Sequence, residues 1–124
     1  MNDLIHKEEA YQIIGICMEV HRELGHGFLE AVYKDALEYE FNQAGILYRR
    51  EHLFDIPYKK TVLRKRYQAD FTVFNRVILE AKAIESIPDE LVGCAINYPK
   101  VSGYSLCLLV NFGQPSLEFR RIVL

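Results

Sequence analysis

One stretch of the sequence, residues 68–83, constrains the fold more than any other. Its pattern indicates two β-strands joined by a short turn at residues 74–76. Because alternate residues of a strand point to the same face, Glu80 and Lys82 are expected side by side, about 6.5 Å apart along the strand. Their neighbours are apolar, as residues that face a core should be. An acid and a lysine in such a strand are costly to bury unless they are paired or bound to a metal ion.

The turn between the two strands decides whether Asp70, on the first strand, joins Glu80 on the second. Directly opposed residues of an antiparallel pair share a face, so a three-residue loop at 74–76 sets Asp70 opposite Glu80. A two-residue turn would instead oppose Asp70 to Ala81 and send the two acids to opposite faces. Hydrophobic patterning does not choose between these registers. We predict the odd loop, or an equivalent bulge, with Asp70, Glu80 and Lys82 on one face.

Two motifs in this chain resemble those of a nuclease superfamily. Asp70 is followed, after nine residues, by EAK at residues 80–82, which is similar to the D…ExK core of the PD-(D/E)XK nucleases. Upstream, residues 27–33 read GFLEAVY and follow VHRELG at residues 20–25. This combination resembles the GxxExxY protein family, a small-domain branch of that superfamily. The resemblance covers residues 13–123, nearly the whole chain.

The resemblance implies a Mg²⁺ or Mn²⁺ site that hydrolyses phosphodiester bonds. Asp70 and Glu80 would ligate the metal, the carbonyl of Ala81 would assist, and Glu30 would complete or support the site. Mg²⁺ suits such a set, since it takes one or two carboxylates together with water and phosphate oxygens. Lys82 would orient the attacking water or stabilise the transition state. The expected catalytic residues are therefore Asp70, Glu80, Lys82 and Glu30.

One position departs from the superfamily pattern. The helix after the strands should carry a glutamine four residues before a tyrosine, and here Tyr98 is present but the glutamine position is Cys94. Cysteine is a weak hydrogen-bond partner, so the departure bears on the geometry around Lys82. The alternative to a metal site is that Asp70, Glu80 and Lys82 form only a buried ion-pair network.

His21, Tyr33 and Tyr98 are candidate supporting residues, and a second acid competes with Glu30. His21 lies on the apolar face of the first predicted helix, as a hydrogen-bonded core histidine or as a supporting residue beside the site. Tyr33 is expected to pack where helix and sheet meet, and Tyr98 to support the site. Glu40 is a rival to Glu30 for an inward-pointing carboxylate, and Glu30 is preferred on the family resemblance.

Positive charge is concentrated next to the candidate site. Residues 1–46 hold nine acids against three Lys or Arg, whereas residues 49–66 hold seven Lys or Arg against two acids. Such a stretch is either a nucleic-acid track or a solvated edge hairpin, because edge strands carry charge to avoid aggregation. The candidate nucleic-acid contacts are Arg49, Arg50, Lys59, Lys60, Arg64, Lys65 and Arg66.

The order of predicted elements gives the fold class. Apolar residues at helical spacing predict two helices, and alternating or β-rich runs predict five strands with one more helix among them. The order ααβββαββ indicates an α/β fold, a mixed β-sheet flanked by helices, resembling the PD-(D/E)XK nuclease (restriction-endonuclease-like) fold. The helices are expected at 7–24, 28–44 and 86–98, and the strands at 47–56, 67–74, 77–83, 104–111 and 117–123.

Composition narrows the class of protein. A chain of 124 residues is long enough to bury a core, and we expect one domain spanning residues 1–124. Three widely spaced cysteines form no zinc pattern and no disulfide framework, which favours a reducing cytoplasm. The N-terminus lacks a signal-peptide layout, and no apolar run approaches the ~20 residues of a membrane span, so no membrane partner is expected.

The leading functional prediction is a Mg²⁺-dependent nuclease or a nuclease-like nucleic-acid-binding protein. The alternative is a non-catalytic interaction module, or a homodimeric structural subunit, that retains the nuclease fold. The intact Asp70, Glu80 and Lys82 set favours the first. Cys94 and a net charge of only −2 favour the second. A protein partner or self-association would help so small a domain to select its targets.

Overall fold

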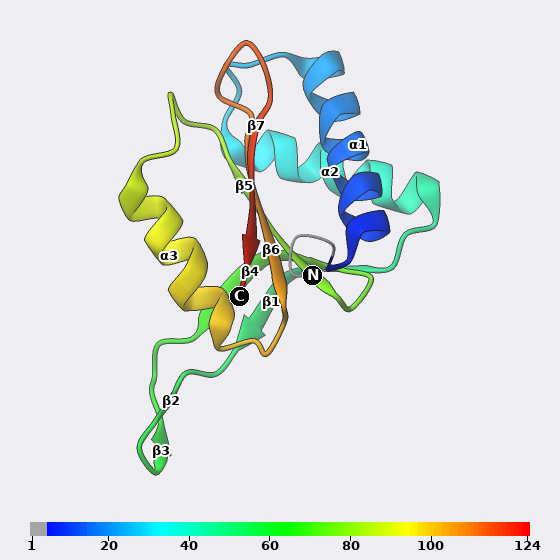
Figure 1. The fold of residues 1–124 in the computed structure, drawn as a ribbon. Helices are drawn as coiled ribbons and strands as arrows, with labels where there is room; N and C mark the ends of the chain where they lie inside the picture. Colours follow the sequence, from blue (N-terminus) through cyan, green and yellow to red (C-terminus); the bar gives the residue numbers. More distant parts are fainter. Residues whose placement is uncertain (1–4) are drawn as a thin grey trace.

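The fold is a five-stranded mixed β-sheet with helices on both faces, seen in a computed structural model that describes residues 5–124 (Figure 1). The sheet order is β1-β4-β5-β6-β7, with β5 and β6 parallel and the other neighbours antiparallel. This confirms the predicted fold class. The elements are α1 (Lys7–Leu24), α2 (Glu30–Ala44), β1 (Tyr48–Phe54), β2 (Pro57–Tyr58), β3 (Thr61–Val62), β4 (Tyr67–Val73), β5 (Val77–Lys82), α3 (Asp89–Lys100), β6 (Leu106–Asn111) and β7 (Glu118–Val123).

Each face of the sheet carries its own hydrophobic core. Helices α1 and α2 cover one face and α3 covers the other (Figure 1). Strand β5 serves both cores, since Val77, Leu79 and Ala81 belong to the α1–α2 core and Ile78 to the α3 core. The period of two in this strand therefore places Glu80 and Lys82 on the face that α3 covers. Within residues 5–124, no helix is both long and apolar enough to cross a membrane.

The first two helices follow their apolar stripes closely. Helix α1 has the predicted bounds and ends at Gly25, whose φ of +69° suits glycine. Helix α2 begins at Glu30 rather than at residue 28, because Leu29 is extended and 79% exposed. The predicted helix range of 28–44 would include Leu29, and that start is wrong, because Leu29 precedes the helix and lies outside the core.

The hairpin between β4 and β5 has the register that the site requires. Val73 pairs with Val77 and Phe71 with Leu79, so the connecting loop is the three residues 74–76. Phe74 and Asn75 both take positive φ, 59° and 55°, to make this loop. The predicted odd loop is confirmed.

Strand β4 changes face halfway along its length. Ala69 belongs to the α3 core and Phe71 to the α1–α2 core, although residues two apart in a regular strand share a face. Opposite this point, β1 pairs through Arg50 and His52 but not through Glu51, whose φ is +58°. The break in pairing lies at Glu51 and Asp70, so Asp70 is the residue at which the side chains of β4 change from one face of the sheet to the other.

Residues 57–62, in the middle of the basic stretch, form a separate two-stranded ribbon. Pro57 pairs with Val62 and Tyr58 with Thr61, and neither strand joins the main sheet. The ribbon projects from the body of the molecule (Figure 1). Part of the sequence between β1 and β4 is therefore a hairpin, but one that extends away from the sheet edge.

Helix α3 differs from its prediction at both ends. It begins at Asp89 rather than at Ser86, because Pro88 is extended and provides no side-chain cap. Its last turn includes Pro99, whereas the helix was expected to weaken at Tyr98. Proline removes only its own N–H, and here the carbonyls of Tyr98 and Pro99 still accept hydrogen bonds from Val101 and Ser102.

A buried asparagine ties together the ends of the two parallel strands. Asn111, at the end of β6, accepts from the N–H groups of Ile84 (2.9 Å) and Gly113 (3.0 Å) through Oδ1. Its Nδ2 donates to the Ile84 carbonyl (2.9 Å) and to Glu118 (3.1 Å). All of its polar capacity is used, which fits its full burial. The segment that follows Lys82 is thereby fixed to the neighbouring strand.

We predict that Gly113→Ala destabilises the fold by roughly 1–3 kcal/mol or more, because a Cβ there would lie 2.1 Å from the Ile84 carbonyl oxygen. Gly15→Ala is the matched control, since its Cβ meets nothing within 4 Å and alanine favours the interior of α1 by about 1 kcal/mol. Urea unfolding of both variants measures the difference. Equal stability of the two variants would contradict the packing described here.

Candidate functional site

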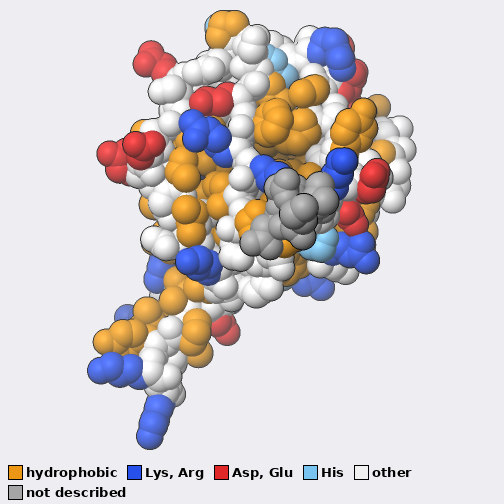
Figure 2. Space-filling view, in the orientation of Figure 1, with side chains coloured by type: hydrophobic (Ala, Val, Ile, Leu, Met, Phe, Trp, Pro, Cys, Tyr) orange, Lys and Arg blue, Asp and Glu red, His pale blue; other side chains and the backbone are white. Residues whose placement is uncertain are grey.

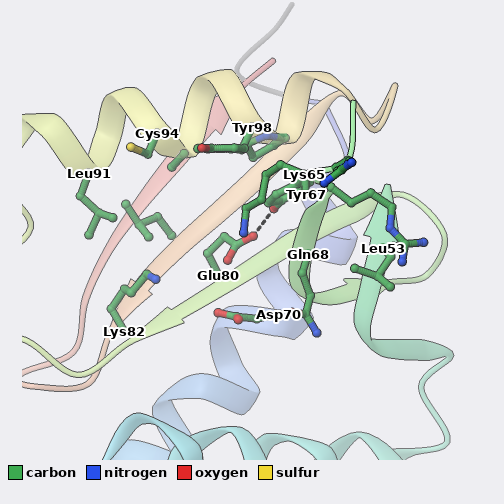
Figure 3. Close-up of a pocket in the computed structure, with 15 residues that line it drawn as sticks. Leu53, Lys65, Tyr67, Gln68, Asp70, Glu80, Lys82, Leu91, Cys94 and Tyr98 are labelled. Carbon is green, nitrogen blue, oxygen red and sulfur yellow. Dashed lines mark hydrogen bonds between the residues drawn. The ribbon is translucent and has the colours of Figure 1, made fainter. Parts of the chain in front are cut away.

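A cavity of about 570 Å³ lies between α3 and the strands β4 and β5. Figure 3 shows the side chains of Asp70, Glu80 and Lys82 converging at its floor, with α3 above them. The three predicted site residues are thus brought together on one face. The remaining lining residues are Leu53, Arg64, Lys65, Arg66, Tyr67, Gln68, Leu91, Cys94, Ala95, Tyr98, Pro99 and Leu109.

Glu80 is a buried carboxyl group with an unusual proton affinity. It is 8% exposed and accepts a hydrogen bond from the hydroxyl of Tyr67, drawn in Figure 3. Burial, and then the negative charge of Asp70, raise the pKa of Glu80 to about 8, although Tyr67 and Lys82 act in the opposite direction. Two carboxyl groups this close cannot both ionise cheaply without a cation beside them.

Asp70 is held where β4 and β5 separate. Ladder pairing between these strands ends at Phe71 and Leu79. Beyond that pair, Oδ2 of Asp70 accepts the backbone N–H of Ala81 at 2.8 Å. The carboxylate therefore takes the place of a backbone carbonyl, which satisfies Ala81 and fixes the orientation of Asp70.

A lysine that the sequence analysis did not identify contacts this carboxylate. Nζ of Lys34, on α2, lies 2.8 Å from Oδ1 of Asp70 and 3.2 Å from Oε1 of Glu30. Burial by itself lowers the pKa of Lys34, but its hydrogen bonds and charge interactions with Asp70 and Glu30 outweigh this and raise it. The i,i+4 spacing between Glu30 and Lys34 predicts the contact of Lys34 with Glu30. Nothing in the sequence pattern indicates its contact with Asp70.

Among residues 5–124, Glu30 is therefore linked to the site through Lys34. Its side chain is 37% exposed and does not line the cavity. Glu40 lies further along α2, so Glu30 is the acid of this helix that is linked to Asp70. Within the part of the chain that the structure describes, no group of three or more His, Cys, Asp or Glu side chains is arranged to hold a metal ion. Direct ligation by Glu30 stays a prediction.

The donor set of Asp70 and Glu80 fits a hard divalent cation. Mg²⁺ needs only one or two protein carboxylates, because water and phosphate oxygens supply its other ligands. Burial, and then the negative charge of Asp70, raise the pKa of Glu80, and a bound divalent ion would offset both effects. Ala81 lies between Glu80 and Lys82, where its carbonyl is the predicted further ligand.

Helix α3 contributes the outer wall of the cavity. Tyr98 stacks on Tyr67 with ring centroids 5.9 Å apart, and Cys94 lies one turn earlier on the same side. Cys94, which stands where the superfamily pattern has glutamine, thus lines the same cavity as Asp70, Glu80 and Lys82. Cys94 is exposed there with a free thiol.

The seven predicted nucleic-acid contacts separate into several places. Arg64, Lys65 and Arg66 line the cavity, and no ion pair among residues 5–124 involves them. Lys59 and Lys60 are exposed at the tip of the ribbon, where Figure 2 shows positive side chains gathered on the projecting arm.

The two arginines of β1 differ from the rest of this set. Arg49 is exposed beside His52, at 3.2 Å. Arg50 instead pairs with Asp35 (2.7 Å) and Glu38 (3.0 Å) of α2, so its charge is used within the fold.

His21 and Tyr33 lie in the α1–α2 core rather than at the cavity. Nε2 of His21 is 2.8 Å from the carbonyl oxygen of Gln114. Tyr33 is fully buried, stacks on Phe112 at 4.7 Å and donates its hydroxyl proton to the Gly25 carbonyl at 2.7 Å. These contacts fit the interpretation of His21 as a hydrogen-bonded core histidine and of Tyr33 as a packing residue. Neither residue lines the cavity.

Comparison with protein families identifies the group to which this arrangement belongs. The model of the PD-(D/E)XK nuclease superfamily matches residues 7–122. The chain belongs to the PD-(D/E)XK nuclease superfamily. Searches of curated proteins and of solved structures found no match. The finer resemblance, to the GxxExxY branch, stays a prediction, and the superfamily assignment indicates a nuclease-like function.

We predict that Lys34→Met lowers the free energy of unfolding by about 1–3 kcal/mol in EDTA, because it leaves the half-buried Asp70 without its cation. Added Mg²⁺ or Mn²⁺ should raise the melting temperature of this variant more than that of the wild type, since one nearby positive charge is gone. Lys100→Met, at an exposed position, is the control. An equal rise in melting temperature in the wild type and in both variants would contradict the idea that Lys34 and a metal ion compete for Asp70.

A second prediction concerns pH. The folded protein holds a proton on Glu80 up to about pH 8, whereas unfolded chains release it near the ordinary value of 4.5. Stability in EDTA should therefore fall by up to a few kcal/mol as the pH rises through this window. Glu80→Gln, which keeps an acceptor for Tyr67, should lose this dependence. Unfolding free energies at several pH values test it, and the same slope in both proteins would disprove the assignment.

Proposed function

We propose that this chain is a metal-dependent nuclease that hydrolyses phosphodiester bonds at the Asp70–Glu80 cavity. The observation that carries the proposal is the meeting of two carboxyl groups and Lys82 on diverging strands, at the floor of a cavity with a basic rim. Superfamily membership supports the reaction class. Nucleic acid is the corresponding partner.

The proposed metal is Mg²⁺ or Mn²⁺, held by Asp70 and Glu80 with help from the Ala81 carbonyl, while Glu30 acts as a further ligand or as an outer support. Such an ion activates water and neutralises charge that develops on phosphate oxygens. For this chain the consequence is that Glu80 is ionised when the ion is bound. Tyr67 keeps the carboxylate oriented through its hydroxyl, and Lys34 does the same for Asp70.

Lys82 is proposed to stabilise negative charge on the phosphate. A protonated lysine is a compact point charge that donates hydrogen bonds but cannot ligate a metal ion. Its position two residues after Glu80 places the ammonium at the cavity floor beside the carboxylates, as Figure 3 shows. Positive charge fixed there in advance favours the transition state, in which the phosphate carries more charge.

A second candidate function has one observation in its favour. Cys94 stands where the superfamily pattern has glutamine and faces the cavity with a weakly hydrogen-bonding group. A chain that keeps the fold and binds nucleic acid or protein without cleaving anything, or that serves as a homodimeric subunit, would tolerate this change. Cleavage assays separate the two functions.

We also propose that residues 1–124 act as one domain in the cytoplasm. Support comes from the family match over residues 7–122 and from Cys17, Cys94 and Cys107, which are all free thiols.

We predict that the protein cleaves nucleic acid in Mn²⁺ or Mg²⁺ and that Lys82→Ala lowers the rate roughly 100-fold or more. Metal binding, followed by thermal shift, should persist in Lys82→Ala and be lost in Asp70→Asn. Lys100→Ala is the control for a lysine outside the cavity. Wild-type rates in Lys82→Ala would show that its assigned role is wrong, and a complete absence of cleavage in the wild type would favour the second candidate function.

We further predict that nucleic-acid affinity falls steeply with salt and that reversing Arg64, Lys65 and Arg66 to glutamate flattens the slope. Removal of one phosphate-binding side chain should reduce the slope of log K against log salt by about 0.7 for a single strand. Reversing Lys7, Arg22 and Arg120 makes the same change in net charge at residues that do not line the cavity. Titrations at several salt concentrations measure both, and equal slopes would place the binding surface elsewhere.

A further inference from the structure

A column of aromatic rings ends in the cavity. Phe54 stacks on Tyr67 with centroids 5.9 Å apart, and Tyr67 stacks on Tyr98 at the same distance. Tyr104 supports Phe54 from the side at 5.8 Å. Tyr67, the middle ring, is 7% exposed, whereas Tyr98 at the cavity end is 42% exposed, so Tyr98 offers the accessible ring.

The walls of the cavity differ in chemistry on its two sides. The α3 wall contributes the aromatic and aliphatic side chains of Tyr98, Leu91 and Pro99, whereas the segment before β4 contributes Arg64 and its two basic neighbours. Figure 3 labels Lys65 among them. A base favours the first surface, because every base has a π face that stacks on an aromatic ring. A phosphate backbone favours the second.

The carboxyl groups at the floor are deep. Glu80 is 8% exposed and the side chain of Asp70 is 13% exposed. A phosphate group that contacts these two carboxyl groups therefore requires its nucleoside to lie inside the cavity, between α3 and the basic rim. The cavity of about 570 Å³ has the size of pockets that enclose a small ligand, roughly 300–1,000 Å³. A nucleotide within a duplex reaches such a place only after unpairing and unstacking, which costs a few kcal/mol.

We propose that the cavity takes an unpaired nucleotide of single-stranded nucleic acid, with its base stacked on Tyr98 and its backbone held by the 64–66 rim. This inference rests on the proposed nuclease function and adds its substrate class. Tyr67 acts twice, since it supports the stacking ring and hydrogen-bonds Glu80. A base stacked on Tyr98 would therefore contact the ring that packs on Tyr67, and Tyr67 in turn orients the Glu80 carboxylate.

The test measures binding without metal, so that no cleavage occurs. Fluorescence anisotropy in EDTA compares a short labelled single strand of mixed sequence with the same strand in a duplex. The wild type should bind the single strand more tightly. Tyr98→Ala should weaken that binding roughly 5- to 150-fold, the loss of one stacked base, with a smaller effect on the duplex.

Matched variants separate stacking from folding. Tyr98→Phe keeps the ring and should keep the affinity, and Tyr39→Ala removes a 60% exposed tyrosine of α2 that does not line the cavity. If Tyr98→Ala does not fold, a 2-aminopurine base in the single strand reports stacking in the wild type through quenching of its fluorescence. Equal affinity for single strand and duplex, or a Tyr98→Ala variant with wild-type affinity, overturns the inference.

The outcome for the proposed function is read separately. If the wild type cleaves single strands and duplexes alike while Asp70→Asn cleaves neither, the nuclease proposal stands and the single-strand inference falls. If single strands bind through Tyr98 and nothing is cleaved, the inference stands as a binding site and the nuclease proposal falls.

Discussion

The hydrogen bond from the Ala81 N–H to Asp70 is the contact on which the site depends. It lies where β4 and β5 stop pairing, and it lets the strands separate without leaving a buried donor unsatisfied. The change of face within β4 brings Asp70 to this point. Without that separation, β4 and β5 would continue to pair through backbone hydrogen bonds, and no space would open between Asp70 and Glu80.

The two carboxyl groups are stabilised in different ways. Asp70 has a cation, Lys34, whereas Glu80 has a hydroxyl donor and a raised pKa, which favours the protonated form. A buried pair of like charges is thereby avoided while each group stays hydrogen-bonded. Ionising Glu80 costs free energy in the folded protein, and a bound divalent cation would offset that cost.

Much of this arrangement could be predicted from the sequence, because it depends on local periodicity. Alternation in β5 indicated the face of Glu80 and Lys82. The hairpin register was predicted because the site requires Asp70 and Glu80 to meet, and the structure has that register. Contacts between distant segments were not accessible in this way. Lys34 meets Asp70 across a helix–sheet interface, and Arg50 turns to α2 instead of solvent. Local patterns also misplaced Leu29, because the chain leaves the helical path just before Glu30.

Neither strand of the β2–β3 ribbon pairs with the five-stranded sheet, and a two-stranded ribbon by itself has little independent stability. Its length is therefore almost free to vary, since each doubling of a flexible loop costs only about 0.6 kcal/mol. Insertions and deletions there would alter how far positive charge extends from the cavity while leaving the β4–β5 register intact. In an evolving lineage, the reach of this positive charge and the geometry of the Asp70–Glu80 cavity could thus change independently of each other.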